Sequence, residues 1–332
     1  MMTPRLPKNE HRRNARPNPA DKSSCSSVSG VVLLDKPAGL SSNAALTRVK
    51  RFLKAKKAGH TGTLDPFATG LLPLCFGEAT KFSHDLLNAD KTYEAVIHLG
   101  IRTATGDTEG EIVEKQDIAS VLPERVESVL RCFLGDIAQI PPMYSALKRD
   151  GKPLYAYARE GVTLARDARR VRIHALELLD MQLPFLTLRV HCGKGTYIRV
   201  LGEDIGTALG SCAHLNALRR VRVGTLDVSD ACVLEHLESG VQSRAQILNP
   251  VDSLLLAHMP VTLSEELANR FLQGQRLSIS KEGIAVSANA SRVRVYNTAD
   301  VLLGTALIRQ DGVLTPERLI SLSALCVGAS AA

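Results

Sequence analysis

The first half of the chain alternates between two hydrophobic patterns. Residues 30–34 are an unbroken run of small and branched apolar side chains, which predicts a buried strand. After the serine pair at 41–42, either of which can cap a helix, apolar residues recur at helical spacing. A further helix is expected over residues 78–87. From residue 91 to 103 apolar and polar side chains alternate, which predicts a strand with Tyr93 on its apolar face.

The second half continues with similar elements and ends in a region of different character. The pattern predicts a helix at 123–134, strands at 171–183 and 185–192, a helix capped by Thr196, and a half-exposed strand at 218–224 in which basic and apolar residues alternate. From about residue 261 a short helix is followed by β segments at 293–296 and 301–308. A chain of 332 residues exceeds the usual size of one hydrophobic core, so we expect two domains.

Positive charge is concentrated in two places. The net charge is +7, and residues 1–29 contribute +4 of it, together with four prolines and a serine-rich end. This segment is expected to be a disordered basic arm, either a solvated tail or a non-specific RNA contact. Residues 41–57 carry six Lys or Arg and no acid, so that helix presents either a solvated face or phosphate contacts.

Composition and motifs exclude several classes of protein. The seven cysteines are widely spaced without a C-x-x-C pair, and the nine histidines are scattered, so neither a disulfide framework nor a metal site is predicted. The Gly-Lys-Ser/Thr ending of a phosphate-binding P-loop is absent, which disfavours ATP or GTP hydrolysis. No apolar run is long enough to span a membrane, and no signal peptide is evident. We therefore expect a cytoplasmic protein.

The stretch from Gly59 to Gly70 is the part of the chain from which chemistry can be argued. Its glycines permit unusual backbone angles, and the proline after Asp65 biases that aspartate away from helical geometry. Asp65 is then either an N-cap for a helix over residues 67–72 or a catalytic carboxylate. Arg199 falls in the first turn of its predicted helix, where the helix dipole disfavours a cation. It needs a partner such as Asp65, unless it reaches back to solvent.

Four motifs occur in the order in which one enzyme family has them. They are DKPAGLSS at residues 35–42, GHTGTLDPFATGLLPLCFGEATK at 59–81, KTYEAVIHLGIRTATGD at 91–107 and CGKGTYIRVLGEDIG at 192–206. Together they resemble the tRNA pseudouridine(55) synthases of the TruB family. The resemblance implies an α+β pseudouridine synthase fold, with a mixed and largely antiparallel central sheet flanked by helices. It also implies a catalytic domain over 30–255 and a small, mostly β, PUA-like RNA-binding domain over 256–332.

The same resemblance implies a reaction and assigns residues to it. The enzyme would convert uridine 55 in the T loop of tRNA to pseudouridine after flipping the base, with no cofactor, no metal and no obligate protein partner, and as a monomer. Asp65 would be the catalytic carboxylate and Arg199 its ionic partner. Tyr93, which is otherwise a core tyrosine, would stack on the base and is a candidate for the proton step. His60, Tyr197, Leu218 and Lys36 would bind the substrate, although Lys36 is better explained as a support for the active-site loop.

Two other functions remain open at this point. One is an RNA-binding or tRNA-folding protein without turnover, and the other is a pseudouridine synthase that depends on a guide RNA. The intact set of Asp65, Tyr93 and Arg199 argues against the first. Activity of the purified protein alone on unmodified tRNA would exclude the second.

Overall fold

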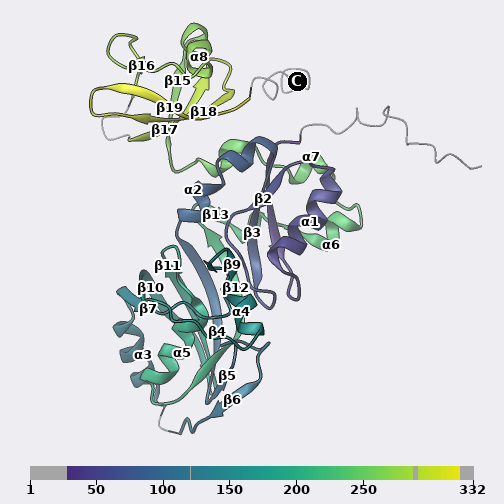
Figure 1. Ribbon diagram of the computed structural model, residues 1–332, viewed down its shortest axis with the longest axis vertical. Helices are drawn as coiled ribbons and strands as arrows, with labels where there is room; N and C mark the ends of the chain where they lie inside the picture. Colours follow the sequence, from purple (N-terminus) through teal and green to yellow (C-terminus); the bar gives the residue numbers. More distant parts are fainter. Residues whose placement is uncertain (1–27, 120, 287–290, 322–332) are drawn as a thin grey trace, which may run out of the picture.

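The computed structural model describes residues 28–119, 121–286 and 291–321, which form two units, each built on its own sheet (Figure 1). Within these residues, ten strands form a mixed sheet in the first unit, and five strands form the sheet of the smaller C-terminal unit. Only the pairs β1 with β14 and β3 with β12 are parallel in the large sheet. The expected mixed, largely antiparallel architecture is therefore confirmed, while the tail at 1–27 lies outside the described residues.

The large sheet runs in the order β14 (Cys232–Val233), β1 (Gly30–Lys36), β3 (Thr69–Phe76), β12 (Ala213–Val223), β4 (Lys91–Leu99), β11 (Phe185–Cys192), β10 (Arg169–Gln182) and β7 (Gly135–Gln139), with β2 (Ala58–His60) paired to β3 and β13 (Leu226–Asp227) paired to β12. Two small hairpins are β5 (Ile101–Thr103) with β6 (Ile112–Lys115), and β8 (Lys148–Arg149) with β9 (Lys152–Pro153). The helices of this unit are α1 (Ser42–Leu53), α2 (Ser83–Asn88), α3 (Pro123–Cys132), α4 (Leu154–Arg159), α5 (Ile198–Ala208), α6 (Leu234–Glu238) and α7 (Arg244–Ile247), with 3-10 turns η2 (Gly77–Lys81), η3 (Val228–Asp230) and η4 (Val251–Leu254). The C-terminal unit contains β15 (Met259–Leu263), α8 (Glu265–Leu272), β16 (Leu277–Ser278), β17 (Arg292–Asn297), β18 (Leu302–Ile308) and β19 (Val313–Leu319).

The main core lies between one face of the large sheet and helices α1, α3 and α5. A second cluster covers the other face near β1 and β3, with residues from η2, α2 and η4. Because β1 is covered on both faces, its sequence is a continuous apolar run rather than an alternating one. Farther along the sheet this second face is exposed and carries ion pairs, such as Arg189 with Glu94 and Glu177.

The structure corrects three details of the predicted elements. Residues 67–72 are not a helix, because Thr69–Phe76 pairs with β1 along its length, so Asp65 is not a helix cap. The helix expected at 78–87 is divided into η2 and α2. Thr196 does not cap α5, since its hydroxyl donates to the Gly193 carbonyl and the N-cap position belongs to Tyr197. For Thr69–Phe76, long-range pairing with β1 outweighed the local preference.

The two units contact each other through polar groups around α2 and η2. Asp85 of α2 accepts hydrogen bonds from Arg292 of β17 and, at 3.0 Å, from His258 in the connecting segment. Glu78 of η2 accepts a 2.7 Å bond from the backbone N–H of Ser321. The C-terminal unit is therefore attached to the segment that leads directly into β4.

Gly70 is a position where the fold requires glycine. It lies in β3 with a φ of +100°, and an added Cβ would come within 2.3 Å of the Arg220 carbonyl oxygen and 2.7 Å of its nitrogen on β12. Gly70→Ala is expected to lower the free energy of unfolding by about 2–4 kcal/mol, because strand backbones would have to separate. Gly59→Ala is the matched control, since its Cβ would meet nothing within 4 Å. Urea unfolding of both variants measures the difference, and equal losses would contradict this account.

Candidate active site

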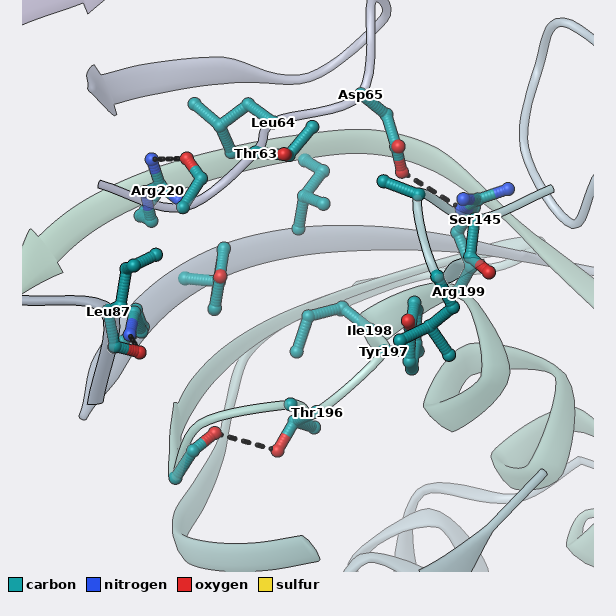
Figure 2. A pocket seen from close by; sticks show the side chains of 18 residues that line it. Thr63, Leu64, Asp65, Leu87, Ser145, Thr196, Tyr197, Ile198, Arg199 and Arg220 are labelled. Carbon is teal, nitrogen blue, oxygen red and sulfur yellow. Dashed lines mark hydrogen bonds and ion pairs between the residues drawn. The ribbon is translucent and has the colours of Figure 1, made fainter. Parts of the chain in front are cut away.

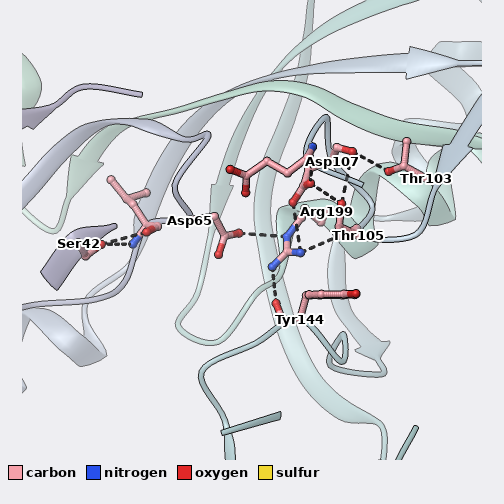
Figure 3. Close-up of polar contacts among 9 residues, drawn as sticks. Ser42, Asp65, Thr103, Thr105, Asp107, Tyr144 and Arg199 are labelled. Carbon is pink, nitrogen blue, oxygen red and sulfur yellow. Dashed lines mark hydrogen bonds and ion pairs between the residues drawn. The ribbon is translucent and has the colours of Figure 1, made fainter. Parts of the chain in front are cut away.

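Asp65 lies in the loop between β2 and β3, and a serine on α1 fixes that loop (Figure 3). The buried Ser42 hydroxyl accepts a 2.8 Å hydrogen bond from the Leu64 N–H and donates a 3.0 Å bond to the Leu64 carbonyl. Ser41, its neighbour, caps α1. The two serines thus have separate roles: one starts the helix and the other holds the residue before Asp65.

Lys36, the last residue of β1, supports the same loop. Its side chain is fully buried, and its Nζ donates to the carbonyls of Pro37 (2.8 Å), Leu40 (2.7 Å) and Pro66 (3.2 Å). Burial lowers the pKa of Lys36 to about 8, with the Asp65 charge acting in the opposite direction. An ammonium that is occupied by three carbonyls acts as a support for the loop, as one of the two sequence-based interpretations of Lys36 proposes.

We expect Lys36→Met to separate loop support from substrate binding. The variant leaves three carbonyls without their donor, so we expect a loss of about 2–4 kcal/mol in the free energy of unfolding. Turnover should fall because the Asp65 loop loosens, while the Kd for tRNA should change little. Urea titration, single-turnover kinetics and filter binding measure the three quantities. A large rise in Kd with unchanged stability would instead place Lys36 among the substrate contacts.

Arg199, in the first turn of α5, is the partner of Asp65. Its Nε lies 3.0 Å from Asp65 Oδ2, and its Nη1 lies 3.3 Å from Asp107 Oδ2. The remaining donors reach the carbonyls of Thr105 (2.8 Å) and Tyr144 (2.6 Å) (Figure 3). The arrangement bears out the inference that a cation at this helix position needs a carboxylate. It also leaves Arg199 fixed by four acceptors in a buried setting.

Asp107 is the last residue of the motif at 91–107, but the sequence analysis did not assign it a role in the site. Its buried carboxylate accepts a hydrogen bond from the Thr105 hydroxyl and a 3.0 Å bond from the Glu109 N–H, in addition to pairing with Arg199. The bond to an N–H two residues ahead is an Asx turn. The run Thr-Ala-Thr-Gly-Asp at residues 103–107 is the sequence signal that could have marked Asp107 as an aspartate held in a turn.

The pKa of Asp65 is raised above its usual value. Burial is the largest cause and the Asp107 charge adds to it, whereas Arg199 and Lys36 act in the opposite direction. The side chain keeps 35% of its surface exposed because it faces a cavity. Arg199 is therefore the main group that favours the ionised form of Asp65 against the effect of burial.

The cavity beside Asp65 has a volume of about 350 Å³, within the range of small-molecule sites (Figure 2). Among the predicted site residues, the structure places Asp65, Tyr93, Tyr197, Arg199 and Leu218 in its lining. His60 instead lines an adjoining space that shares Asp65 and Arg199, and Lys36 lines neither. The lining also includes two cations that the sequence analysis did not single out for the site, Lys91 and Arg220.

Arg220 is buried, contrary to the expectation for residues 218–224. The sequence pattern predicts a half-exposed strand. Pairing of β12 with β4 is regular from Leu218 to Arg220, so these two residues share one face, and Arg220 lies directly opposite Tyr93. The face of a strand that turns inward is decided by such long-range pairing, so alternation alone assigned Arg220 wrongly.

The remaining aromatic groups are held in neutral forms. Burial raises the pKa of both Tyr93 and Tyr197, and the charge of Arg220 opposes this effect at Tyr93. Burial and the Arg220 charge lower the pKa of His60, whose buried Nδ1 has no hydrogen-bond partner among the described residues. At neutral pH His60 is an uncharged ring with a free polar atom, which suits stacking or hydrogen bonding to a base.

No group of three or more His, Cys, Asp or Glu in the described part of the chain could hold a metal ion. No helix within residues 28–119, 121–286 and 291–321 is long and apolar enough to cross a membrane.

Comparison with solved structures supports the fold. The crystal structure of a Cbf5-Nop10-Gar1 complex matches with a TM-score of 0.67 and 25% identity, covering 87% of this chain and 84% of the other. An H/ACA RNP bound to a substrate RNA containing 2'-deoxyuridine matches with a TM-score of 0.66 and 23% identity, covering 88% and 85% of the two chains. Both matches span the two units described above.

Comparison with sequences identifies the family. The model of the TruB family pseudouridylate synthase N-terminal domain matches residues 50–198, the tRNA pseudouridylate synthase B C-terminal domain matches 199–256, and the pseudouridine synthase II TruB C-terminal model matches 260–320. The tRNA pseudouridine synthase B of Burkholderia mallei (strain NCTC 10247) is 57% identical over 295 residues, which are 88% of this chain and 97% of the relative. That of Ralstonia pickettii (strain 12J) is 56% identical over 308 residues, 89% of this chain and 95% of the relative. The chain, with its Asp65–Arg199 pair beside a base-sized cavity, belongs to the TruB family of pseudouridine synthases.

Proposed function

We propose that the protein converts uridine 55 in the T loop of tRNA to pseudouridine, with Asp65 as the reacting carboxylate. The protein is a TruB-family tRNA pseudouridine synthase, and its curated relatives carry the name tRNA pseudouridine synthase B. The observation that carries the assignment of Asp65 is its 3.0 Å ion pair with Arg199 at the edge of a cavity lined by Tyr93 and Leu218.

The chemistry requires a carboxylate and an enclosed space. The N-glycosidic bond of a uridine breaks, the uracil turns, and its C5 joins the same sugar carbon, so nothing is oxidised or added. Asp65 lies at the junction of the two spaces, where a ribose with its base in the cavity would place the sugar carbon. Arg199 keeps the carboxylate ionised in spite of burial, and Leu218 and Tyr197 enclose the base. No cofactor takes part in this scheme.

Access to the cavity requires that the target base leave the RNA stack, which costs a few kcal/mol. His60 lies in the adjoining space, on the other side of the Asp65 loop from Tyr93. As a neutral ring it can stack on the RNA bases that remain when the target nucleotide turns outward. Arg51, an exposed cation in the last turn of α1, is suited to phosphate contacts.

The rest of the chain is assigned supporting roles. Residues 30–255 form the catalytic domain, and the C-terminal domain, over 256–332, is a PUA-like module that binds RNA. The protein works in the cytoplasm as a monomer without an obligate protein partner. Polar contacts such as Asp85 with Arg292 would hold the C-terminal domain against α2, so that one bound tRNA reaches both domains.

Tritium release from an unmodified tRNA transcript with C5-tritiated uridine tests the proposal. Purified wild-type protein in excess EDTA is expected to release tritium, mapped to the T-loop uridine, and Asp65→Asn is expected to release none. A failure of both proteins, with tRNA binding kept, would favour an RNA-folding role. Release only after addition of a guide RNA and partner proteins would favour a partner-dependent synthase, the class that the Cbf5-Nop10-Gar1 match brings into view.

A further inference from the structure

Helix α5 begins beside the cavity without a cap from its own first residues. Tyr197 occupies the N-cap position and its side chain forms no capping hydrogen bond, while the Thr196 hydroxyl donates back to the Gly193 carbonyl. The first backbone groups of a helix need partners from outside the helix. For α5 such a partner is Gln139, which lies 58 positions before Tyr197 at the end of β7.

The Gln139 side chain holds both backbone groups of Tyr197. Its Oε1 accepts a 3.0 Å hydrogen bond from the Tyr197 N–H, and its Nε2 donates a 3.3 Å bond to the Tyr197 carbonyl. That carbonyl also accepts a 3.0 Å bond from the Leu201 N–H, the first bond within α5. Gln139 is only 2% exposed, and both of its amide atoms are used on one backbone residue. The two bonds therefore define the position and direction in which α5 starts.

The start of α5 decides where Arg199 lies. Arg199 follows Tyr197 in the first turn, and its Nε is 3.0 Å from the Asp65 carboxylate. Tyr197, Ile198 and Arg199 all line the cavity. Figure 2 shows Tyr197 and Arg199 on the same side of it, together with Ser145. Because the helix is a rigid element, a displacement of its first residue carries the guanidinium away from Asp65.

A second contact ties the same two segments together. Arg199 Nη2 donates a 2.6 Å hydrogen bond to the carbonyl of Tyr144, in the segment that follows β7 (Figure 3). The side chain of Gln139 thus binds the backbone of α5, and a side chain of α5 binds the backbone of the segment that follows Gln139. Residues 145–147 of that segment line the cavity. Loss of the Gln139 amide would open this reciprocal arrangement at one end.

Packing alone does not explain a glutamine at this position. Gln139 is the last residue of β7 and is paired with Arg169 of β10 in the sheet. Backbone pairing of this kind needs no particular side chain, and an apolar group would fill a buried position without the cost of removing an amide from water. The amide finds its partners on Tyr197, so the glutamine is explained by what it does to the start of α5.

We propose that Gln139 is a positioning residue, whose amide fixes the start of α5 and thereby holds the Arg199 guanidinium against Asp65. The inference rests on the proposed function, since it takes Asp65 as the reacting carboxylate. Gln139 exchanges no proton with the substrate. It acts through Arg199, which favours the ionised form of Asp65 against the effect of burial.

The pH dependence of the reaction tests the inference. Gln139→Met nearly keeps the size of the side chain and removes both hydrogen bonds. We expect the single-turnover rate to fall about 10–100-fold, as a small misplacement of a catalytic group causes, and the Kd for tRNA to change less than about threefold. The acidic limb of the pH–rate profile should move up by about one pH unit, because a displaced Arg199 lowers the pKa of Asp65 less. In the Arg199→Met background the same substitution should leave the acidic limb in place.

Gln246→Met is the matched control. Gln246 also binds the backbone at a helix start, where it accepts a 2.8 Å bond from the Ser243 N–H, but its helix, α7, contributes no residue to the cavity. Its rate and acidic limb should match those of wild type. Hydrogen exchange adds a measurement that needs no turnover. The Tyr197 amide should exchange at least about tenfold faster in Gln139→Met, because it loses its acceptor.

Two results would overturn the inference. One is an acidic limb that stays in place in Gln139→Met, or that moves equally with and without Arg199, since Gln139 would then not act through that arginine. The other is unchanged exchange of the Tyr197 amide.

If Gln139→Met does not fold, Gln139→Glu takes its place. Its protonated acid can make both bonds to Tyr197, whereas the carboxylate cannot donate to the carbonyl, so its rate relative to wild type should rise as the pH falls. A ratio that does not change with pH would contradict the inference. A wild type that forms no pseudouridine would contradict the proposed function alone, and the exchange measurement would still test the contact between Gln139 and Tyr197.

Discussion

Replacing Asp65 by asparagine is expected to lower the single-turnover rate of pseudouridine formation by at least about 10⁴-fold, because the reacting carboxylate is lost while its shape is kept. The asparagine side chain would still fill the loop that Ser42 and Lys36 hold, so the cavity should persist. The Kd for tRNA should change by less than about threefold, since Asp65 contributes chemistry and not phosphate contacts. Tritium release under enzyme excess, with filter binding beside it, measures both. A residual rate above about one tenth of wild type would remove Asp65 from the mechanism.

Asp65→Asn should lower the rate without lowering the stability of the fold at neutral pH. The pKa of Asp65 is raised in the folded protein, so its contribution to stability is fully present below the unfolded pKa and is lost as the pH rises through the folded pKa. At neutral pH the ionised carboxylate therefore weakens the fold, and Asp65→Asn should melt at a temperature equal to or above that of wild type. The difference should shrink as the pH falls toward the ordinary pKa of an aspartate. A large drop in melting temperature at neutral pH would mean that the aspartate holds the loop instead.

The sequence revealed the site partly through local rules and partly through the family resemblance. Local chemistry left Asp65 as either a helix cap or a catalytic carboxylate, whereas the partner of Arg199 could be inferred because a cation in the first turn of a helix is unfavourable. The alternation of residues 91–103 correctly placed Tyr93 on the inner face of β4. Such features depend on neighbours within a few positions, so a single sequence contains them.

The parts that were missed depend on residues far apart in the chain. Residues 67–72 read as a capped helix, but pairing with β1 makes a strand. Arg220 looked like an exposed residue of an alternating strand, but the pairing of β12 with β4 places it opposite Tyr93 and buried. Asp107 became a site residue only through Arg199, which lies 92 positions later. Register shifts and long-range ion pairs are decided by tertiary packing, which local pattern does not encode.

Replacing Arg199 by methionine is expected to damage both the fold and the reaction. The substitution leaves the Asp107 carboxylate buried and unpaired, and breaking a buried pair in this way costs about 3–5 kcal/mol of unfolding free energy. It also removes donors from the carbonyls of Thr105 and Tyr144. The single-turnover rate at neutral pH should fall by about 10²–10⁴-fold, since Asp65 loses both its orientation and its counter-charge.

The pH dependence distinguishes the loss of charge from the loss of geometry. Arg199 lowers the pKa of Asp65 against the effect of burial, so without it the acidic limb of the pH–rate profile should move to higher pH. Arg199→Lys keeps a positive charge but cannot serve four acceptors, so its acidic limb should stay near that of wild type while its rate still falls. Arg189→Met is the control, because that arginine is 46% exposed on the open sheet face and pairs with Glu94 and Glu177 in solvent. An acidic limb that stays in place in Arg199→Met would show that Asp65 does not depend on Arg199 for its ionised form.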